Sequence, residues 1–277
     1  MAIGGLDARL PMGTASMSAT QHLLACSRNA ISEVPASRWD VRAQPSLPEP
    51  IASRVRHGGF VLGAEYVDNA AFGVSPSETA AMDPQQRLLL EHGYAALHDA
   101  GLDRAGLNGS GTGFFLGIAS NDFTQILPNM PAGGSVYSAT GMALSIASGR
   151  VSYVLGLHGP CASYDTACSS SLTAGHAGLR SLQMNECDTG LVAGVTLMLS
   201  PNTATAFGIA GMTSPLGKCH TFDARADGYA RGEACGQLAL QHNAAQTNLS
   251  WLGSAVRQDG RSASLTAPSG RAQQGLI

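Results

Sequence analysis

A cysteine between a short strand and a helix is the feature that most constrains how this chain folds. Residues 161–164 have strand character, and a helical pattern follows that places Leu172, Leu179 and Leu182 near one face, with small residues between them. Cys168 therefore lies at a predicted strand-to-helix corner. The small residues on both sides of it allow such a corner to form without steric conflict.

Such a corner favours a reactive thiol. At the start of a helix the N–H groups are unpaired and the helix dipole favours negative charge. This setting lowers the pKa of a thiol and makes its thiolate available for covalent catalysis. The same N–H groups could stabilise an oxyanion if the thiolate attacked a carbonyl. Free cysteines are also among the most buried residues, so a purely structural Cys168 is the alternative at this point.

The composition indicates a compact globular chain. At 277 residues it is long enough for one large domain or two small ones, with 44% hydrophobic residues, 13% charged residues and 34 glycines. Sixteen basic and nineteen acidic side chains give a net charge of −3 without a basic tract, so we expect no nucleic-acid partner. The longest apolar run, residues 191–199, is too short to cross a membrane.

The cysteine pattern favours a reducing compartment and no metal site. The six cysteines form no C-x-x-C pair and no zinc-type spacing, so we expect reduced thiols. The amino terminus shows neither the basic nor the apolar part of a signal peptide. We expect a cytoplasmic protein, although a plastid presequence could have been lost upstream.

Strand and helix patterns alternate along most of the chain, which predicts an α/β architecture with parallel strands and helices on both faces. Asp83 is a natural N-cap and Gly101 a natural stop for one of the helices, and Gly156 is a natural stop for another. Irregular loops are expected at 33–40 and 42–56. Strands are predicted at 3–9, 113–119, 161–164, 190–199 and 236–240, and helices at 19–30, from 84 to the stop at Gly101, at 143–155, after 168 and between 200 and 211.

The segment Gly159–Leu172, which reads Gly-Pro-Cys-Ala-Ser-Tyr-Asp-Thr-Ala-Cys-Ser-Ser-Ser-Leu, resembles the active-site signature of β-ketoacyl synthases. Within that family it is most similar to the ketosynthase domain of modular (type I) polyketide synthases. Further blocks that resemble the family occur in the family's order, and the resemblance covers essentially all 277 residues. These blocks are residues 82–91, 140–153, 218–236 and 256–270.

The resemblance implies the thiolase fold, in which two related α/β halves stack in five α-β-α-β-α layers. Residues 1–277 would then be the N-terminal portion of a ketosynthase domain that is incomplete at the C-terminus. Residues 1–245 would form the first thiolase-like half and 246–277 the start of the second. Cys168 would hold the growing acyl chain as a thioester. Phe207 would line the acyl pocket, with plain core packing as its alternative.

The implied activity is a decarboxylative Claisen condensation in polyketide or fatty-acid biosynthesis. An acyl chain on Cys168 would react with a malonyl-type extender carried on the phosphopantetheine of an acyl carrier protein, with no other cofactor and in a homodimer. The family's two catalytic histidines lie beyond residue 277. We do not expect a local histidine to replace them, since His176 is eight residues from Cys168, or about 12 Å along a helix. The chain alone is therefore expected not to complete condensation.

Two alternatives follow from the missing histidines. The chain could be a non-catalytic dimer partner or pseudoenzyme, or it could only hydrolyse the acyl group that its cysteine accepts. The chain also departs from the family pattern at a few positions. Met142, Arg257 and Ser269 stand where asparagines are usual, and Met142 would lie near the acyl channel. Ala234 replaces a glycine and would be strained if that position required a positive φ.

Overall fold

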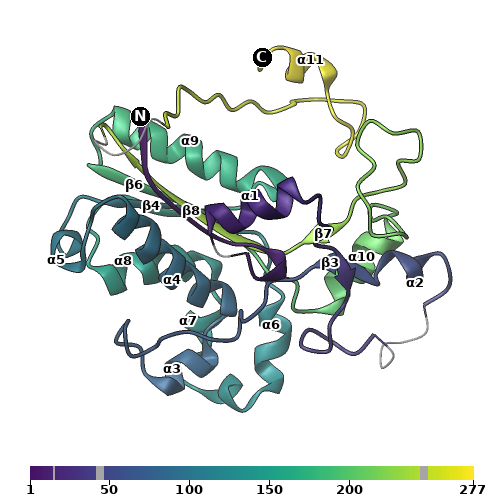
Figure 1. Cartoon of the computed structure of the whole chain (residues 1–277), viewed down its shortest axis with the longest axis horizontal. Helices are drawn as coiled ribbons and strands as arrows, with labels where there is room; N and C mark the ends of the chain where they lie inside the picture. The colour runs from purple at the N-terminus through teal and green to yellow at the C-terminus, as the bar shows by residue number, and fades with distance from the viewer. Residues whose placement is uncertain (15, 42–46, 244–248) are drawn as a thin grey trace.

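A five-stranded sheet forms the centre of the molecule in the computed structural model (Figure 1), which describes residues 1–14, 16–41, 47–243 and 249–277. The inner strand β4 is buried along its whole length, as expected for a strand covered on both faces. In spatial order the strands are β1 (Ala2–Arg9), β8 (Ala234–Gln241), β6 (Thr189–Thr196), β4 (Gly113–Gly117) and β5 (Cys161–Tyr164).

The sheet is mixed, so the predicted parallel arrangement is only partly right. β4 runs parallel to β5 and to β6, whereas β8 runs antiparallel to both β6 and β1. The reason is the path of the chain after β6. It passes through peripheral elements and returns to the same end of the sheet, where Ala234 at the start of β8 pairs with Thr196 at the end of β6. A strand that begins beside the end of its neighbour must run in the opposite direction.

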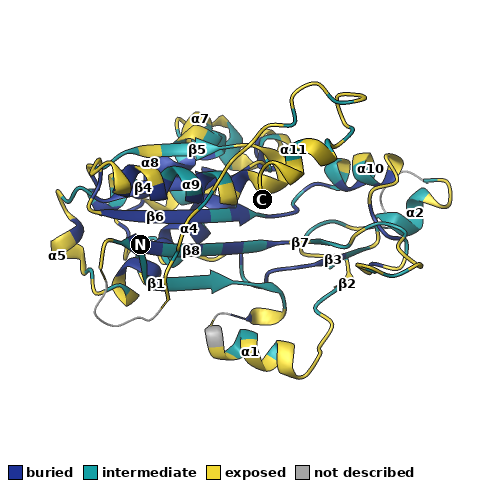
Figure 2. Ribbon diagram, turned by 90° about the horizontal axis from the view of Figure 1, so that it is seen from above, coloured by how far each residue is buried: buried dark blue, intermediate teal, exposed yellow. Residues whose placement is uncertain are grey.

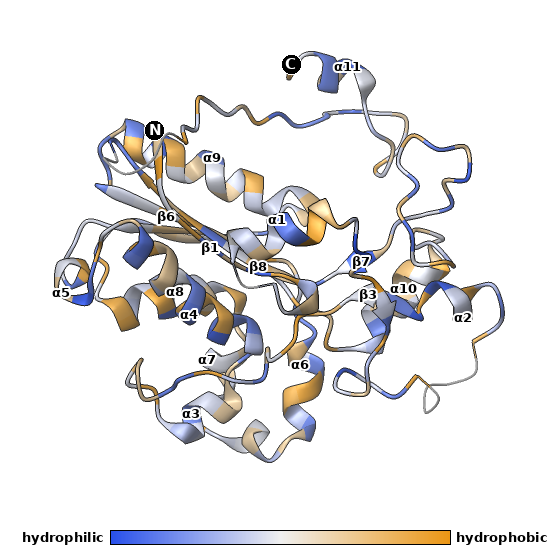
Figure 3. Cartoon of the chain, viewed as in Figure 1, coloured by the Kyte–Doolittle hydropathy of each residue, from blue (hydrophilic) through white to orange (hydrophobic). Residues whose placement is uncertain are grey.

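Helices cover both faces of this sheet, as predicted. α4 (Pro84–Asp99) and α8 (Leu144–Leu155) pack on one face, and α9 (Ser170–Gln183) packs on the other. Figure 2 shows that burial is concentrated in the central strands and in the helix surfaces against them, and Figure 3 shows hydrophobic residues along the same strands. The result is an α/β/α sandwich.

The helix ends that were predicted from short-range signals are confirmed. The carboxylate of Asp83 accepts a hydrogen bond from the backbone N–H of Gln85 at 2.8 Å, and Pro84 is the first residue of α4. Gly101 follows α4 with φ of 83°, and Gly156 ends α8 with φ of 70°. Both glycines occupy the left-handed region that suits a helix end.

A smaller sheet lies beyond the ends of β6 and β8. It consists of β2 (Ser32–Glu33), β3 (His57–Gly59) and β7 (Arg231–Gly232), and α10 (Pro201–Ile209) packs on α2 (Ile51–Arg54) beside it. The remaining described helices are α1 (Met17–Ala25), α3 (Pro76–Ala81), α5 (Arg104–Leu107), α6 (Phe123–Ile126), α7 (Ser138–Met142) and α11 (Gly270–Gln274), with short 3-10 turns η1 (Pro11–Gly13), η2 (Leu127–Asn129), η3 (Pro131–Gly134) and η4 (Ala167–Ser169).

Two of the predicted segments differ from the structure. The helix predicted at 19–30 ends at Ala25, because Ser27 adopts a positive φ of 49° that a helix cannot continue through. The predicted loop 42–56 contains the four-residue helix α2, whereas its residues 42–46 lie outside the described part of the chain.

No helix among the described residues has the length and apolar character needed to cross a bilayer. The C-terminal residues from 249 onward follow α9 along its outer side (Figure 1). There His176 on α9 lies 2.8 Å from the hydroxyl of Ser254, and Trp251 packs so closely that a Cβ on Gly175 would lie 2.4 Å from its ring.

Candidate active site

The structure confirms the predicted corner around Cys168. β5 ends at Tyr164, the short turn η4 contains Cys168, and α9 begins at Ser170. The side chain of Cys168 is exposed, so this cysteine is not the buried structural residue that its type alone would suggest. It is therefore accessible at the start of a helix, which is the placement that thiol catalysis requires.

The other cysteines give a useful contrast. Cys187 and Cys235 are buried, and burial raises the pKa of both thiols, that of Cys235 to about 12. Both shifts favour the protonated thiol, which is a poorer nucleophile than the thiolate. All six cysteines are free in the structure.

The turn that presents Cys168 has an unusual backbone. Ala167 adopts φ of 56°, a conformation that is rare for a residue with a Cβ. The carboxylate of Asp165 accepts a hydrogen bond from the N–H of Ala167 at 3.0 Å. The hydroxyl of Ser169 donates to the carbonyl of Thr166 at 2.9 Å. Local side chains thus stabilise the reversal between β5 and α9 that brings Cys168 to the surface.

Two glycines of the sheet determine where α9 begins. A Cβ on Gly117, the last residue of β4, would lie 2.4 Å from the backbone nitrogen of Ser171. A Cβ on Gly194 of β6 would lie 2.8 Å from the Cβ of Ser171. Both distances are shorter than a real contact, so a larger residue at either position would displace the first turn of α9. The packing of this turn on β4 and β6 therefore sets the position of Cys168.

The three leucines that the helical pattern places near one face of α9 differ in burial. Leu172 is 69% exposed, whereas Leu179 and Leu182 are 2% and 0% exposed. In the first turn of α9 it is Ser171 that faces the sheet, and Leu172 lies about 100° further round the helix. The described part of the chain leaves that side of the first turn uncovered.

Phe207 lies on α10 and is partly buried. The guanidinium carbon of Arg231 is 4.8 Å from the centre of its ring, a cation–π contact. Burial lowers the pKa of Arg231, although this side chain remains charged at neutral pH. The contact explains how the ring is held, and the assignment of Phe207 to an acyl pocket stays a prediction.

The histidines give no local partner for Cys168. Within the described part of the chain no histidine is hydrogen-bonded to its thiol, and His176 contacts Ser254 instead. A cysteine–histidine contact does occur at the end of α1, where the sulfur of Cys26, the residue after the helix, is 3.7 Å from Nε2 of His22. The spacing of four residues on a helix could have indicated this contact from the sequence.

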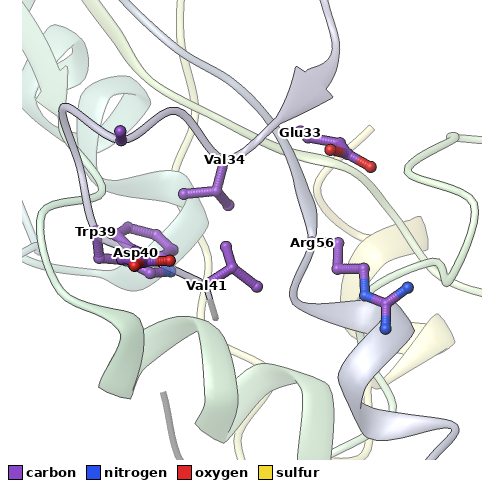
Figure 4. A pocket seen from close by; sticks show the side chains of 7 residues that line it. Glu33, Val34, Trp39, Asp40, Val41 and Arg56 are labelled. Atoms are coloured by element: carbon purple, nitrogen blue, oxygen red, sulfur yellow. The ribbon is translucent and has the colours of Figure 1, made fainter. Parts of the chain in front are cut away.

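A cavity of about 510 Å³ lies away from Cys168, in the segment around β2 (Figure 4). Val34, Trp39 and Val41 form an apolar side, and Arg56 lies across the opening from them. Neither Cys168 nor Phe207 lines this cavity. The sequence pattern predicted a simple loop in this segment and gave no signal of a cavity.

The positions that depart from the family pattern have structural explanations. Met142 packs beside a small core cluster of Ala81, Phe123 and Leu127. Ala234 is an ordinary strand residue opposite Thr196, so the strain considered for a positive φ does not arise.

The two remaining positions lie near the end of the chain. Arg257 donates a hydrogen bond to the carbonyl of Gly275. Ser269 caps α11 by accepting a hydrogen bond from Ala272 N–H at 3.2 Å. Neither contact involves Cys168.

An α/β/α sandwich with an exposed cysteine between β5 and the helix on one face of the sheet defines a member of the thiolase-like fold class. Comparison with known proteins agrees. The pattern of the β-ketoacyl synthase N-terminal domain matches residues 1–245, and the chain therefore belongs to the β-ketoacyl synthase family.

Similar proteins include polyketide synthases and a solved ketosynthase. The chain is 42% identical to a component of the phenolphthiocerol/phthiocerol polyketide synthase of Mycobacterium tuberculosis, over 100% of this chain and 18% of the relative. It is also 42% identical to the mycoketide-CoA synthase of the same organism, of which it spans 7%. A solved ketosynthase from module 6 of the bacillaene synthase of Bacillus subtilis 168 superposes with a TM-score of 0.88 at 35% identity, over 99% of this chain and 47% of that structure. The chain thus spans about half the length of a solved ketosynthase domain.

Proposed function

We propose that the protein is a ketosynthase of polyketide assembly in which Cys168 accepts and holds the acyl chain. The observation that supports this most directly is the exposed thiol of Cys168 at the start of α9, within a chain of the β-ketoacyl synthase family. The substrate would be an acyl thioester on the phosphopantetheine arm of an acyl carrier protein, and no other cofactor is needed for this chemistry.

In the first step the Cys168 thiolate attacks the carbonyl carbon of the carrier-bound thioester. A tetrahedral intermediate with a negatively charged oxygen forms, and the unpaired N–H groups at the start of α9 are the natural donors to that oxygen. The carbon–sulfur bond to the carrier then breaks. The acyl group remains on Cys168, and the carrier thiolate leaves and is protonated by solvent.

In the second step a malonyl-type extender loses carbon dioxide, and the resulting carbanion attacks the Cys168 thioester. A carbon–carbon bond forms, the Cys168 thiolate is released, and the β-ketoacyl product stays on the carrier. We propose that the groups assisting this step lie outside these 277 residues, because no histidine contacts Cys168 in the described part of the chain. We therefore expect these residues by themselves to accept an acyl group but not to complete condensation.

Other parts of the chain have proposed roles in the same function. Phe207 would line the acyl pocket, and residues 246–277 would begin the second thiolase-like half after the first half at 1–245. β5 is one of the two outer strands of the main sheet in the described part of the chain, so its free edge would support a homodimer. Free cysteines fit a reducing compartment such as the cytoplasm, where we place the protein.

Acylation of the thiol tests the proposal directly. The protein is incubated with a short acyl thioester of N-acetylcysteamine, and the modified cysteine is located by peptide mass spectrometry. We expect the acyl group on Cys168, with no acylation in Cys168→Ala. Cys161→Ala is the matched control, because Cys161 is also exposed and lies in β5. Acylation that persists in Cys168→Ala, or that maps to another cysteine, would contradict the proposal.

A further inference from the structure

The peptide group that leads into Cys168 is held by one buried hydroxyl. The Ser170 side chain donates a hydrogen bond to the carbonyl of Ala167 at 2.7 Å and accepts one from the N–H of Thr166 at 2.9 Å. The carbonyl of Ala167 and the N–H of Cys168 belong to the same planar peptide unit. A side chain that holds this carbonyl therefore also determines the direction of the Cys168 N–H.

This N–H is free to act as a donor. Cys168 precedes the first hydrogen-bonded turn of α9, and its N–H has no backbone partner among the described residues. The carbonyl of the same peptide unit, by contrast, accepts from both the hydroxyl and the backbone N–H of Ser170. The carbonyl of this peptide unit thus accepts two hydrogen bonds, whereas its N–H, that of Cys168, has no backbone partner among the described residues.

Ser170 is itself fixed by the sheet. The residue is only 6% exposed, and its backbone packs closely on β4: a Cβ on Gly117 would lie only 2.6 Å from the carbonyl carbon of Ser170. The other hydroxyls near the corner, those of Thr166, Ser169 and Thr173, hydrogen-bond among themselves at the exposed surface. Water can replace those exposed contacts, but it has little access to replace the Ser170 hydroxyl.

The positive φ of Ala167 makes this support necessary. A residue with a Cβ at φ of 56° is less stable than in the usual regions and persists only when its surroundings hold it. Ser170 bonds to the peptide units on both sides of Thr166–Ala167, so it holds the strained segment as a clamp.

We propose that Ser170 is a positioning residue that aims the Cys168 N–H at the oxyanion formed during acyl transfer. This inference rests on the proposed function of Cys168 as acyl acceptor. It predicts that loss of the Ser170 hydroxyl slows acylation of the Cys168 thiol much more than its alkylation. Acyl transfer builds a negative charge on a carbonyl oxygen and needs the aimed N–H, whereas alkylation by iodoacetamide displaces iodide from a saturated carbon and builds no oxyanion.

The test compares both reactions in Ser170→Ala, Ser170→Thr and Ser171→Ala. Ser171 is the matched control because it is the next serine of α9 and its hydroxyl forms no hydrogen bond within the described residues. Rates of acylation from an N-acetylcysteamine thioester and of alkylation by iodoacetamide are measured at Cys168 by mass spectrometry. We expect Ser170→Ala to slow acylation by about 10- to 100-fold, as for a misdirected oxyanion donor. Alkylation of Cys168 is expected to change far less.

Ser170→Thr keeps the hydroxyl and should restore acylation, and Ser171→Ala should behave as the unmodified protein. Equal losses of acylation and alkylation in Ser170→Ala, or an unchanged acylation rate, would overturn the proposal. If Ser170→Ala fails to fold, Ser170→Val is compared with Ser170→Thr, because valine and threonine have nearly the same shape and only threonine has the hydroxyl. Equal acylation rates in these two variants would also overturn the proposal. Failure of the unmodified protein to acylate Cys168 at all, with alkylation intact, would instead count against the proposed function.

Discussion

Arg38 and Glu233 form a buried two-point ion pair between the loop after β2 and the residue that joins β7 to β8. Nε and Nη2 of Arg38 each donate to one oxygen of the Glu233 carboxylate at 2.7 Å, and the two side chains are 6% and 0% exposed. The same carboxylate accepts from the N–H groups of Val61 and Met198 at 2.8 and 3.0 Å. One acidic side chain therefore joins three segments of the chain.

Removal of the arginine from this pair should destabilise the fold strongly. Arg38→Ala leaves the carboxylate of Glu233 buried without its cation, and we expect a loss of about 3–5 kcal/mol in the free energy of unfolding. The loss is measured by urea denaturation, with circular dichroism as the signal of unfolding. The control is Arg56→Ala, whose ion pair with Glu49 is exposed on both sides and should contribute less than about 1 kcal/mol. Similar losses in the two variants would argue against the importance of the buried pair.

Asp83 should make stability depend on pH in an unusual direction. Burial raises the pKa of this N-cap carboxyl from 3.8 to about 6. The folded state therefore binds a proton more tightly than the unfolded state, and this contribution is complete below about pH 4 and is lost as the pH rises through about 6. Since one pKa unit corresponds to about 1.4 kcal/mol, the loss is of the order of 3 kcal/mol.

Asp83→Asn tests this linkage, because asparagine is an equally good N-cap and does not ionise. The free energy of unfolding of both proteins is measured by urea denaturation between pH 4 and pH 7. We expect the stability of the unmodified protein, relative to Asp83→Asn, to fall across this interval. Parallel pH profiles would show that Asp83 titrates at its ordinary pKa in the folded state.

Gly117→Ala should disturb the start of α9. The added Cβ would lie 2.4 Å from the backbone of Ser171, where no flexible side chain can move aside. We expect a destabilisation of about 1–3 kcal/mol together with slower alkylation of Cys168, because the helix start must shift. Gly236→Ala is the control, since a Cβ there meets no atom within 4 Å. Thermal unfolding and iodoacetamide kinetics provide the two measurements, and a normal reaction rate in Gly117→Ala would contradict the proposed link between β4 and the thiol.

The variant Phe207→Ala distinguishes between two roles of Phe207, lining an acyl pocket and packing in the fold. If the ring lines the pocket, this variant should favour longer acyl thioesters, with a change of about 10-fold in the ratio of acylation rates for long and short chains. Phe222→Ala is the control, because the Phe222 side chain is fully exposed. Loss of thermal stability in Phe207→Ala with an unchanged chain-length preference would identify the ring as a packing partner of Arg231 only.

The helix boundaries and the corner could be predicted because they depend on neighbouring residues. Asp83, Gly101 and Gly156 act through caps and positive φ angles that involve only the adjacent turn. The corner at Cys168 was likewise predicted from its flanking strand and helix patterns. The direction of β8 was not predictable in this way, because it depends on where the chain returns to the sheet after α10.

The sequence by itself determined the alternation of strands and helices, the caps and the location of a candidate nucleophile, since each of these depends on a few consecutive residues. Only the tertiary structure decided that Leu172 is exposed, that Arg38 meets Glu233 across 195 positions of sequence, and that Gly117 admits the first turn of α9. Such contacts join segments far apart in the chain, and their geometry comes from the packing of whole elements and not from local conformational preference.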